Sequence, residues 1–215
     1  VDALMVENFG DVPFQKQVQP VTIAAMTRII CSIVELSSVP VGVNVLRNDP
    51  QAALAIAAAT GASFIRVNVH IGAMVTDQGL IEGTAAETLR LRDSLDLDVA
   101  ILADVGVKHA TPFDEDWSLE QEAMDAWNRG LADALIVSGR GTGNPTRRED
   151  LERIHRAVPN AKLIVGSGVR NETVSEYSLA SALIVGTAFK RDGCVENEVE
   201  LNRVRELCQF SFFSR

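Results

Sequence analysis

The chain has 215 residues, of which 20 are Lys or Arg and 29 are Asp or Glu, so its formal net charge is −9. Such an acidic chain lacks the broad basic surface that supplies most of the affinity for nucleic acid or an anionic membrane surface. The three cysteines are too few and too widely spaced for a disulfide framework, and no apolar run reaches the roughly 18 residues of a membrane span. We therefore expect one cytoplasmic domain over residues 1–215, with no nucleic-acid partner and no integral membrane segment.

Short Val- and Ile-rich runs alternate along the chain with amphipathic segments. The predicted strands are Ala3–Val6, Val41–Leu46, Phe64–Val69, Val99–Val105, Ala134–Val137, Leu163–Val165 and Ala182–Val185. The predicted helices are Val21–Leu36, Pro50–Thr60, Thr84–Asp93, Leu119–Leu131, Arg148–Val158 and Glu172–Leu179. Strands that alternate with helices in this way indicate βαβ units and a parallel sheet. The predicted fold is α/β, a parallel (β/α)8 barrel of the TIM type.

The number of strand–helix units is about seven, one fewer than such a barrel needs. Because the sequence opens directly in a strand at Val1–Leu4, we expect this chain to lack its first βα unit. An open doubly wound sheet is the structural alternative. That fold normally carries its phosphate-binding glycines after the first strand, whereas here they cluster late.

Polar residues alternate with apolar ones in two neighbouring strands. In the run 64–70, Arg66, Asn68 and His70 lie on the face opposite to three apolar residues, and Asp104 and Lys108 do the same farther along. Barrel enzymes place their active sites at the carboxyl ends of the strands. We therefore expect these side chains to surround a ligand at the mouth, with a self-satisfied ionic network around Arg66, paired to Asp104 or Glu7, as the alternative.

We interpret the acidic and basic members of this set as catalytic. Glu7 or Asp104 would act as the base, Lys108 would stabilise developing negative charge, and His70 would act in proton transfer. The candidate substrate-binding residues are Asn8, Asn44, Arg66, Asn68, Asp77, His109 and Ser138.

We expect no required cofactor. A divalent metal held by His70 and His109 with Asp104 or Asp77 is a weaker alternative, because their spacing matches no known metal motif. Asp77 lies in a loop predicted over residues 71–79, where a solvated acid that caps the next turn is an equal interpretation.

Glycine-rich segments follow the last three predicted strands. Glycine lets the backbone approach an oxyanion closely, and many barrels bind phosphate with the loops after their last two strands. The predicted phosphate-binding residues are Gly166, Ser167, Gly168, Gly186 and Thr187. Tight βα turns without a ligand are the alternative.

Several segments of the sequence together resemble those of the BtpA/SgcQ family. The resemblance runs in order from Val1 to about Glu206 and lies in the segments Val6–Phe14, Gly42–Asn48, Arg66–His70, Val75–Gly79, Leu102–Val105, Lys108–Ala110, Ser138–Gly143, Gly166–Val169 and Val185–Lys190. It implies a phosphate-binding barrel of the ribulose-phosphate-binding kind. Family members usually begin with a strand carrying a His-Leu pair and a Pro-Leu-Pro-Gly-like loop, which this chain lacks.

The resemblance also implies two kinds of function. The founding cyanobacterial member is associated with photosystem I biogenesis at the thylakoid membrane, whereas related bacterial members belong to sugar-utilisation operons and are treated as enzymes. Our leading hypothesis is an isomerase, epimerase, lyase or hydrolase that acts on a small phosphorylated sugar or nucleotide-like metabolite, as a homo-oligomer.

Two alternatives stay open. One is a non-catalytic biogenesis or assembly factor for a membrane complex, which would use its outer surface or the Phe-rich tail Phe210–Arg215 and, in a photosynthetic source, associate peripherally with the thylakoid. The other is a regulator that binds a phosphorylated metabolite without turning it over.

Overall fold

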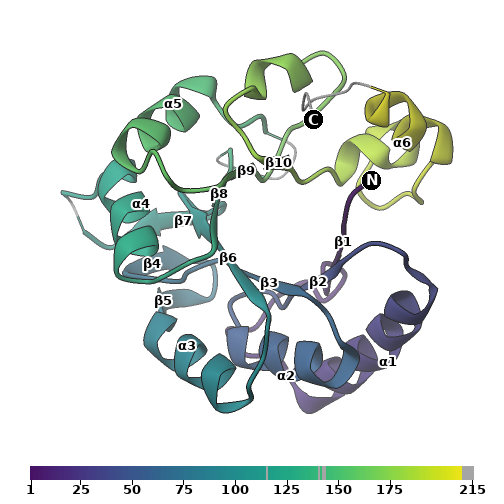
Figure 1. Cartoon of the computed structure of the whole chain (residues 1–215), viewed down its shortest axis with the longest axis horizontal. Coiled ribbons are helices and arrows are strands. Elements are labelled where there is room, and N and C mark those ends of the chain that lie inside the picture. Colours follow the sequence, from purple (N-terminus) through teal and green to yellow (C-terminus); the bar gives the residue numbers. More distant parts are fainter. Residues whose placement is uncertain (115, 140, 142–143, 210–215) are drawn as a thin grey trace.

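Seven parallel strands form one curled sheet in the order β1-β2-β3-β6-β8-β9-β10, and the helices cover its outer side (Figure 1). The computed structural model describes residues 1–114, 116–139, 141 and 144–209. The strands of this sheet are β1 (Leu4–Glu7), β2 (Val41–Asn44), β3 (Phe64–Val67), β6 (Ala100–Val105), β8 (Ala134–Val137), β9 (Leu163–Val165) and β10 (Ala182–Leu183). The α/β barrel fold of the TIM type is thereby confirmed.

Local capping signals mark the ends of some of the α-helices. The α-helices are α1 (Pro20–Leu36), α2 (Pro50–Thr60), α3 (Ala85–Ser94), α4 (Leu119–Asn128), α5 (Arg148–Ala157) and α6 (Leu201–Cys208). The Asp49 side chain accepts the N–H of Ala52 at the start of α2, and Gly61 ends that helix at a φ of 76°. Such capping satisfies backbone groups that a helix end leaves without intrahelical partners.

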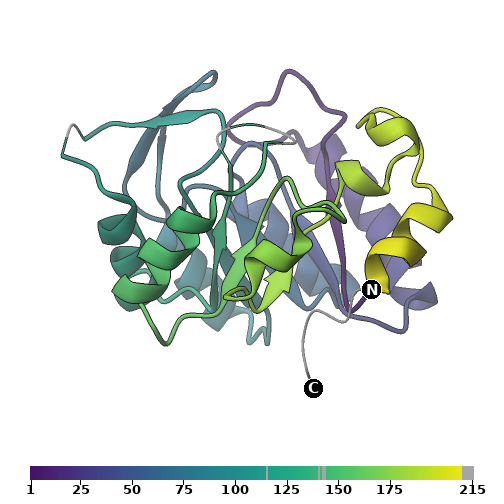
Figure 2. The same ribbon diagram turned by 90° about the horizontal axis from the view of Figure 1, so that it is seen from above.

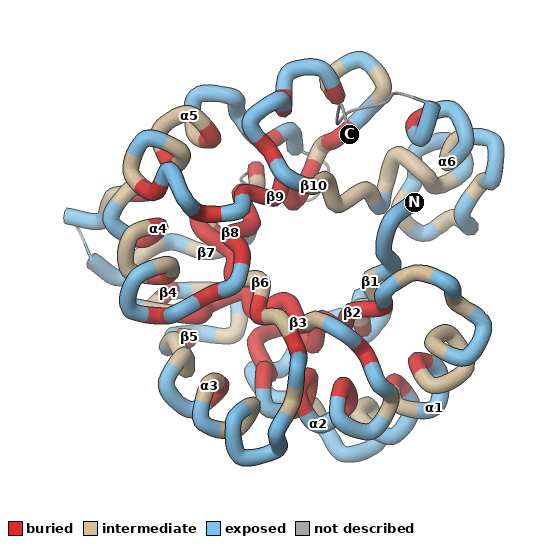
Figure 3. Tube along the Cα trace, in the orientation of Figure 1, coloured by how far each residue is buried: buried red, intermediate tan, exposed pale blue. Residues whose placement is uncertain are grey.

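Apolar packing on the outer side of the sheet holds the helices in place. All four residues of β8 are buried, as parallel strands covered on both faces require (Figure 3). Inside the curl, Ala134, Ile136 and Ile164 form a separate small apolar cluster with residues of β6 and β10. The lumen is therefore apolar beside β8 and β9 at the level of these residues.

The sheet has two edges, β1 and β10, which do not pair with each other in the described part of the chain. Between them lie two short 3₁₀ helices, η2 (Thr187–Phe189) and η3 (Arg191–Gly193), and then α6. In Figure 1 these C-terminal elements stand beside the N-terminus, and the N-terminal amino group lies 3.8 Å from the Cys208 sulfur.

A second, antiparallel sheet stands on the side where the parallel strands end (Figure 2). It has the order β5-β4-β7 and consists of β4 (Ala73–Thr76), β5 (Gly79–Glu82) and β7 (Ala110–Pro112). The predicted loop over residues 71–79 was therefore wrong: it contains a strand that pairs with two others and buries Met74 against Ile81.

Two further sequence expectations fail near the C-terminus. The segment predicted as a helix over Glu172–Leu179 contains only the 3₁₀ helix η1 (Val174–Tyr177), and α6 was not predicted. The Phe-rich tail from Phe210, together with part of the predicted Ser138–Gly143 glycine segment, lies outside the described residues. Among the helices that the structure describes, none is long and apolar enough to cross a bilayer.

Candidate active site

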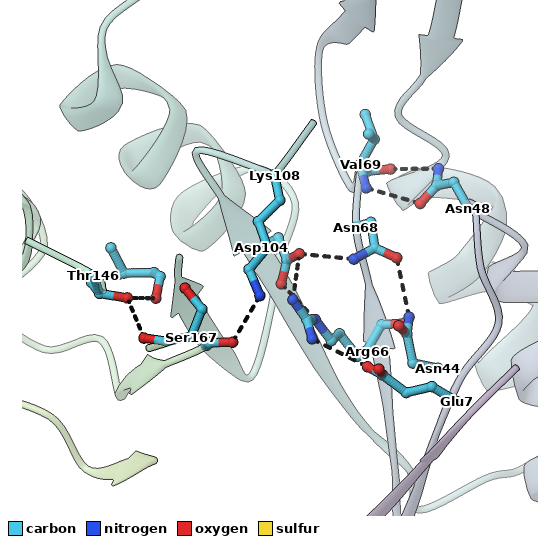
Figure 4. A network of polar contacts seen from close by, with 12 residues as sticks. Glu7, Asn44, Asn48, Arg66, Asn68, Val69, Asp104, Lys108, Thr146 and Ser167 are labelled. Carbon is cyan, nitrogen blue, oxygen red and sulfur yellow. Dashed lines mark hydrogen bonds and ion pairs between the residues drawn. The ribbon is translucent and has the colours of Figure 1, made fainter. Parts of the chain in front are cut away.

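Arg66 is the centre of a buried polar network at the carboxyl ends of β1, β3 and β6 (Figure 4). Its Nε and Nη2 donate to the two carboxylate oxygens of Asp104 at 2.8 and 2.9 Å, and its Nη1 donates to Glu7 Oε1 at 3.2 Å. The side chain of Asp104 is fully buried, whereas that of Glu7 is 26% exposed. Glu7 is thus the carboxylate of the network that a ligand can reach.

Two asparagines extend the network across the sheet. Asn68 donates to Asp104 Oδ2 at 2.8 Å, and its own carbonyl oxygen accepts from Asn44 at 3.1 Å. The Oδ1 atom of Asn44 is buried and has no partner among the described residues. Both carboxylate oxygens of Asp104 therefore accept hydrogen bonds, and Arg66 forms ion pairs with Asp104 and Glu7, the two partners that the ionic-network alternative named.

The charges of this network stabilise one another. Burial alone would lower the pKa of Arg66, but Asp104 and Glu7 raise it above the ordinary value, so Arg66 is a permanent cation. A bidentate guanidinium–carboxylate pair of this kind also fixes the orientation of both partners.

Lys108 lies near this network and contacts the first of the glycine loops. Its Nζ donates to the carbonyl of Gly166 at 3.1 Å, across the cavity from β6 to the end of β9. Burial and the neighbouring Arg66 lower the pKa of Lys108, because both disfavour a second positive charge. The Lys108 ammonium group therefore gives up a proton more readily than one in water.

The two glycine loops present unused backbone donors to the same cavity. The N–H groups of Gly168, Val169, Gly186 and Thr187 donate to no acceptor in the part of the chain that the structure describes. All four residues line the cavity, together with Ser167. Gly168 has a φ of 70°, which favours glycine, and a Cβ there would lie 2.2 Å from Pro145.

The cavity itself gathers most of the predicted site residues. Of those, it is lined by Glu7, Asn44, Arg66, Asn68, Asp104, Lys108, His109, Gly166, Ser167, Gly168, Gly186 and Thr187. Its volume is about 1560 Å³, because it continues from the mouth into the space between β1 and α6. That is ample room for a small metabolite, whose pockets usually measure about 300–1,000 Å³.

Four predicted residues lie elsewhere. His70 is buried beneath α3, where its Nε2 meets the carbonyl of Gly130 at 2.7 Å, and burial lowers its pKa. Asp77 is exposed at the turn between β4 and β5, and the Ser138 Oγ is buried behind Gly166 without a partner among the described residues. The structure therefore does not bring His70 and His109 to a common point.

Asn8, the fourth of these residues, holds a loop in place. Its side chain donates to the carbonyl of Leu46 at 3.1 Å and accepts that residue's N–H at 2.7 Å. Asn48 makes the same pair of bonds to Val69, at 2.9 and 2.8 Å. Each asparagine thus fastens the loop that follows the next strand of the sheet.

Arg47, between these two fastened points, was not predicted as a site residue. Arg47 lines the cavity and is only 6% exposed. It follows β2 in an irregular loop, where neither alternation nor a glycine motif marks it.

Glu122 supports the end of β6 from below. Its Oε2 accepts the N–H of Gly106 at 3.1 Å and the Trp117 Nε1–H at 3.0 Å. Burial raises the pKa of Glu122 to about 7. Gly106 ends β6 at a φ of 67° and turns the chain toward Lys108.

No group of three or more His, Cys, Asp or Glu side chains that could hold a metal ion occurs among the described residues.

Known proteins resemble this chain in sequence and in fold. A family model described as the BtpA family matches residues 1–211. The photosystem I biogenesis protein BtpA of Synechocystis sp. is 48% identical over 206 residues, which cover 95% of this chain and 71% of that protein. The sgc region protein SgcQ of Escherichia coli is 34% identical over 211 residues, 97% of this chain and 78% of its own.

Among solved structures, N-(5'-phosphoribosyl)anthranilate isomerase from Pyrococcus furiosus is similar to the chain with a TM-score of 0.60 and 13% identity. The match covers 97% of this chain and 87% of the isomerase. At this level of identity the likeness concerns the fold alone.

Proposed function

We propose that this chain, which belongs to the BtpA family, is an enzyme that acts on a phosphorylated sugar or nucleotide-like metabolite. The phosphate would bind the backbone donors of the two glycine loops, and the reacting end would lie between Glu7 and Lys108. The reaction we favour is an isomerisation or epimerisation, with a lyase or hydrolase step as the alternative.

The observation that carries this proposal is one cavity that contains both unused backbone N–H groups and a buried ionic network. Four such N–H groups lie in the loops after β9 and β10, and Lys108 reaches from the network to the first of these loops. Backbone donors of this kind bind phosphate oxygens well. A buried salt bridge is weak evidence for stability, and titratable groups with perturbed pKa values in a cleft mark a candidate functional site.

The proton-transfer roles that we propose are based on exposure and hydrogen bonding. Glu7 is partly exposed and keeps one carboxylate oxygen free of Arg66, so it can take a proton from a carbon next to a carbonyl group. The Lys108 N–H groups would then stabilise the negative charge that develops on the carbonyl oxygen. Asp104 would keep Arg66, and through it Glu7, in position.

A thermal-shift and calorimetric screen against phosphosugars and nucleotides tests the phosphate site. Gly186→Asp is the informative variant, because a Cβ at Gly186 meets nothing within 4 Å whereas a Cβ at Gly166 would meet Ser138 and Ile136. We expect a ligand at about 100 times its dissociation constant to stabilise the native protein by about 2.7 kcal/mol, and Gly186→Asp to abolish this gain by charge repulsion.

Gly186→Asn is the matched control, because it adds the same bulk without the charge. If Gly186→Asp and Gly186→Asn bind a phosphorylated ligand equally, the anion does not lie at this loop. If folded wild-type protein responds to no phosphorylated compound in a broad panel, the proposed function is wrong.

Turnover of any ligand found in this way tests the catalytic part. We expect Lys108→Met to lower kcat at least a hundredfold with a small change in KM, because a donor to a developing oxyanion acts mainly in the transition state. Unchanged kcat in Lys108→Met would remove this residue from the mechanism.

A second candidate function is a non-catalytic factor in the biogenesis of a membrane complex. It is favoured by the name of the Synechocystis relative, with which this chain shares 48% identity. Complementation of a strain that lacks that relative separates the two candidates. Restored photosystem I content with a folded Lys108→Met variant supports the factor, and a loss limited to that variant supports the enzyme.

A further inference from the structure

We infer that the cavity contains a second anion site, built on Arg47, and that the ligand is a phosphorylated acid whose carboxylate binds there. This inference rests on the proposed function, because it takes the glycine loops as the phosphate end of the site. It goes further by stating what the other end of the ligand carries.

Arg47 is a buried cation with little compensation. It is 6% exposed, and its only hydrogen bond from the side chain among the described residues runs from Nη2 to the backbone carbonyl of Lys108. A guanidinium has five N–H donors. The side-chain nitrogens of Arg47 that lack a partner among the described residues are not fully buried. Because Arg47 lines the cavity, we take these donors to open onto it.

The nearby acids are not its partners. Asp104 and Asp77 are close enough to act on Arg47 electrostatically, but in the described part of the chain no carboxylate oxygen comes within 4.0 Å of its nitrogens. Asp104 is occupied by Arg66 and Asn68, and Asp77 is exposed and bonded to Gln78. Leaving a buried cation without a counterion is unfavourable, so a bound anion would restore the balance.

The backbone around Arg47 is held unusually firmly. Its own N–H donates to the carbonyl of Gln15 at 2.9 Å, and the preceding residue is fastened by Asn8. Asn48 fastens the other side to Val69, and the Asp49 carboxylate accepts the N–H groups of Val18 and Ala52. Such preorganisation lowers the entropic cost of binding.

The order of contacts places Arg47 at the far end of the ligand from the phosphate loops. Arg47 touches the backbone of Lys108, and the side chain of Lys108 touches Gly166, which begins the first glycine loop. A ligand that spans this line would present a phosphate at one end and an anion at the other, with its central carbons beside Lys108. One uncompensated positive charge matches one negative charge, and the guanidinium fork fits a carboxylate by two parallel hydrogen bonds.

Matched pairs of ligands test this inference directly. The first pair is 3-phosphoglycerate and glycerol 3-phosphate, and the second is 6-phosphogluconate and glucitol 6-phosphate. Within each pair only the carboxylate is replaced, by a hydroxymethyl group. By isothermal titration calorimetry at pH 7.5, we expect wild-type protein to bind the acid at least tenfold more tightly in at least one pair.

In the Arg47→Met variant, the ratio of the affinity for the acid to the affinity for the alcohol (the acid-to-alcohol ratio) should fall to near one. Its affinity for the alcohol should stay within about twofold, because a neutral end gains little from the cation. Arg170→Met, which removes another cation of the same cavity, is the control and should leave the ratio unchanged. A merely structural role of Arg47 would instead weaken both members of a pair equally.

The outcomes separate this inference from the function on which it rests. A ratio near one in wild-type protein for both pairs, or a ratio that survives in Arg47→Met, overturns the second anion site while the phosphate site stands. The wild-type ratio needs no variant, so it decides even if Arg47→Met fails to fold. Absence of binding by every phosphorylated compound would overturn both.

Discussion

The two halves of the cavity differ in the groups that they offer to a ligand. In the half formed by β1, β2, β3 and β6, long polar side chains form hydrogen bonds with one another. In the half formed by β8, β9 and β10, small residues and glycines expose backbone N–H groups, and the lumen wall below them is apolar. Strand length differs as well, because β9 and β10 have only 3 and 2 residues.

This difference suggests that the two halves are suited to different parts of a ligand. A side-chain network can hold charges at defined positions and tune the pKa of a neighbour such as Lys108, which chemistry requires. A glycine loop can come close to a phosphate but offers no titratable group. Under the proposed function, the first half is therefore suited to the reacting part of a ligand, and the second half to its phosphate.

The largest effect on stability is expected from removing Arg66, which lies at the centre of the polar network. Arg66→Met leaves Asp104 buried and without its counterion, so we expect it to lower the free energy of unfolding by about 3–5 kcal/mol. Urea denaturation monitored by circular dichroism measures this change. Arg153→Met is the control, because its ion pair with Glu120 is partly exposed on both sides and should contribute less than about 1 kcal/mol.

If Arg66→Met lowers the free energy of unfolding no more than Arg153→Met does, the buried network contributes no more to folding than a partly exposed ion pair. The double variant Arg66→Met/Asp104→Leu sharpens the point. Because it removes both charges, it should recover much of the stability that Arg66→Met loses.

The next effect concerns the pH dependence of the same half. The pKa of Glu122 is about 7 in the folded chain against 4.5 for an ordinary Glu, so between these values the folded state binds more protons than the unfolded state. Stability should therefore fall as the pH rises from about 4.5 to 7, by about 2–3 kcal/mol, and level off above.

Glu122→Gln should abolish this decline. Both donors to Glu122 bond to one oxygen, so the Gln side-chain oxygen can accept both. Unfolding free energies of the two proteins at pH 5 and pH 8 measure the effect. Parallel pH profiles would mean that Glu122 is already ionised at pH 5 in the folded protein.

The smallest effect on stability distinguishes two glycines in the half of the cavity formed by β8, β9 and β10. A Cβ at Gly166 would lie 2.4 Å from Ser138 Oγ and 2.5 Å from Ile136 Cγ2, so Gly166→Ala should destabilise by about 1–3 kcal/mol through overpacking. Gly186 has open space around its Cα, so Gly186→Ala should change stability by less than about 0.5 kcal/mol. Equal losses in thermal denaturation would show that both glycines serve packing.

The sequence predicts the regular parts of this molecule well. Alternation in β3 and β6 predicts that Arg66 and Asp104 face the cavity, because two-residue periodicity is a local property of a strand. Asn68 and Lys108 also line the cavity, although they lie just beyond the ends of these strands. The same rule fails for His70, because β3 ends at Val67 and the backbone no longer alternates beyond it.

The missed features depend on contacts between distant segments. Strand β4 pairs with β7, more than thirty residues later, and a four-residue run carries too little periodicity to reveal it. Arg47 lies in a loop whose path is set by Asn8 and Gln15, and no local pattern encodes those bonds. Long-range hydrogen bonds of this kind can be seen only in the folded chain.

The asparagine pairs at Leu46 and Val69 have a consequence for how this barrel can diversify. Each asparagine matches both backbone groups of one residue in the neighbouring loop, so adding or deleting a residue in either loop would shift the partner out of reach. The lengths of the loops after β1, β2 and β3 therefore depend on one another. The turn between β4 and β5 carries no such tie among the described residues, so insertions and grafted peptides belong there rather than in the three fastened loops.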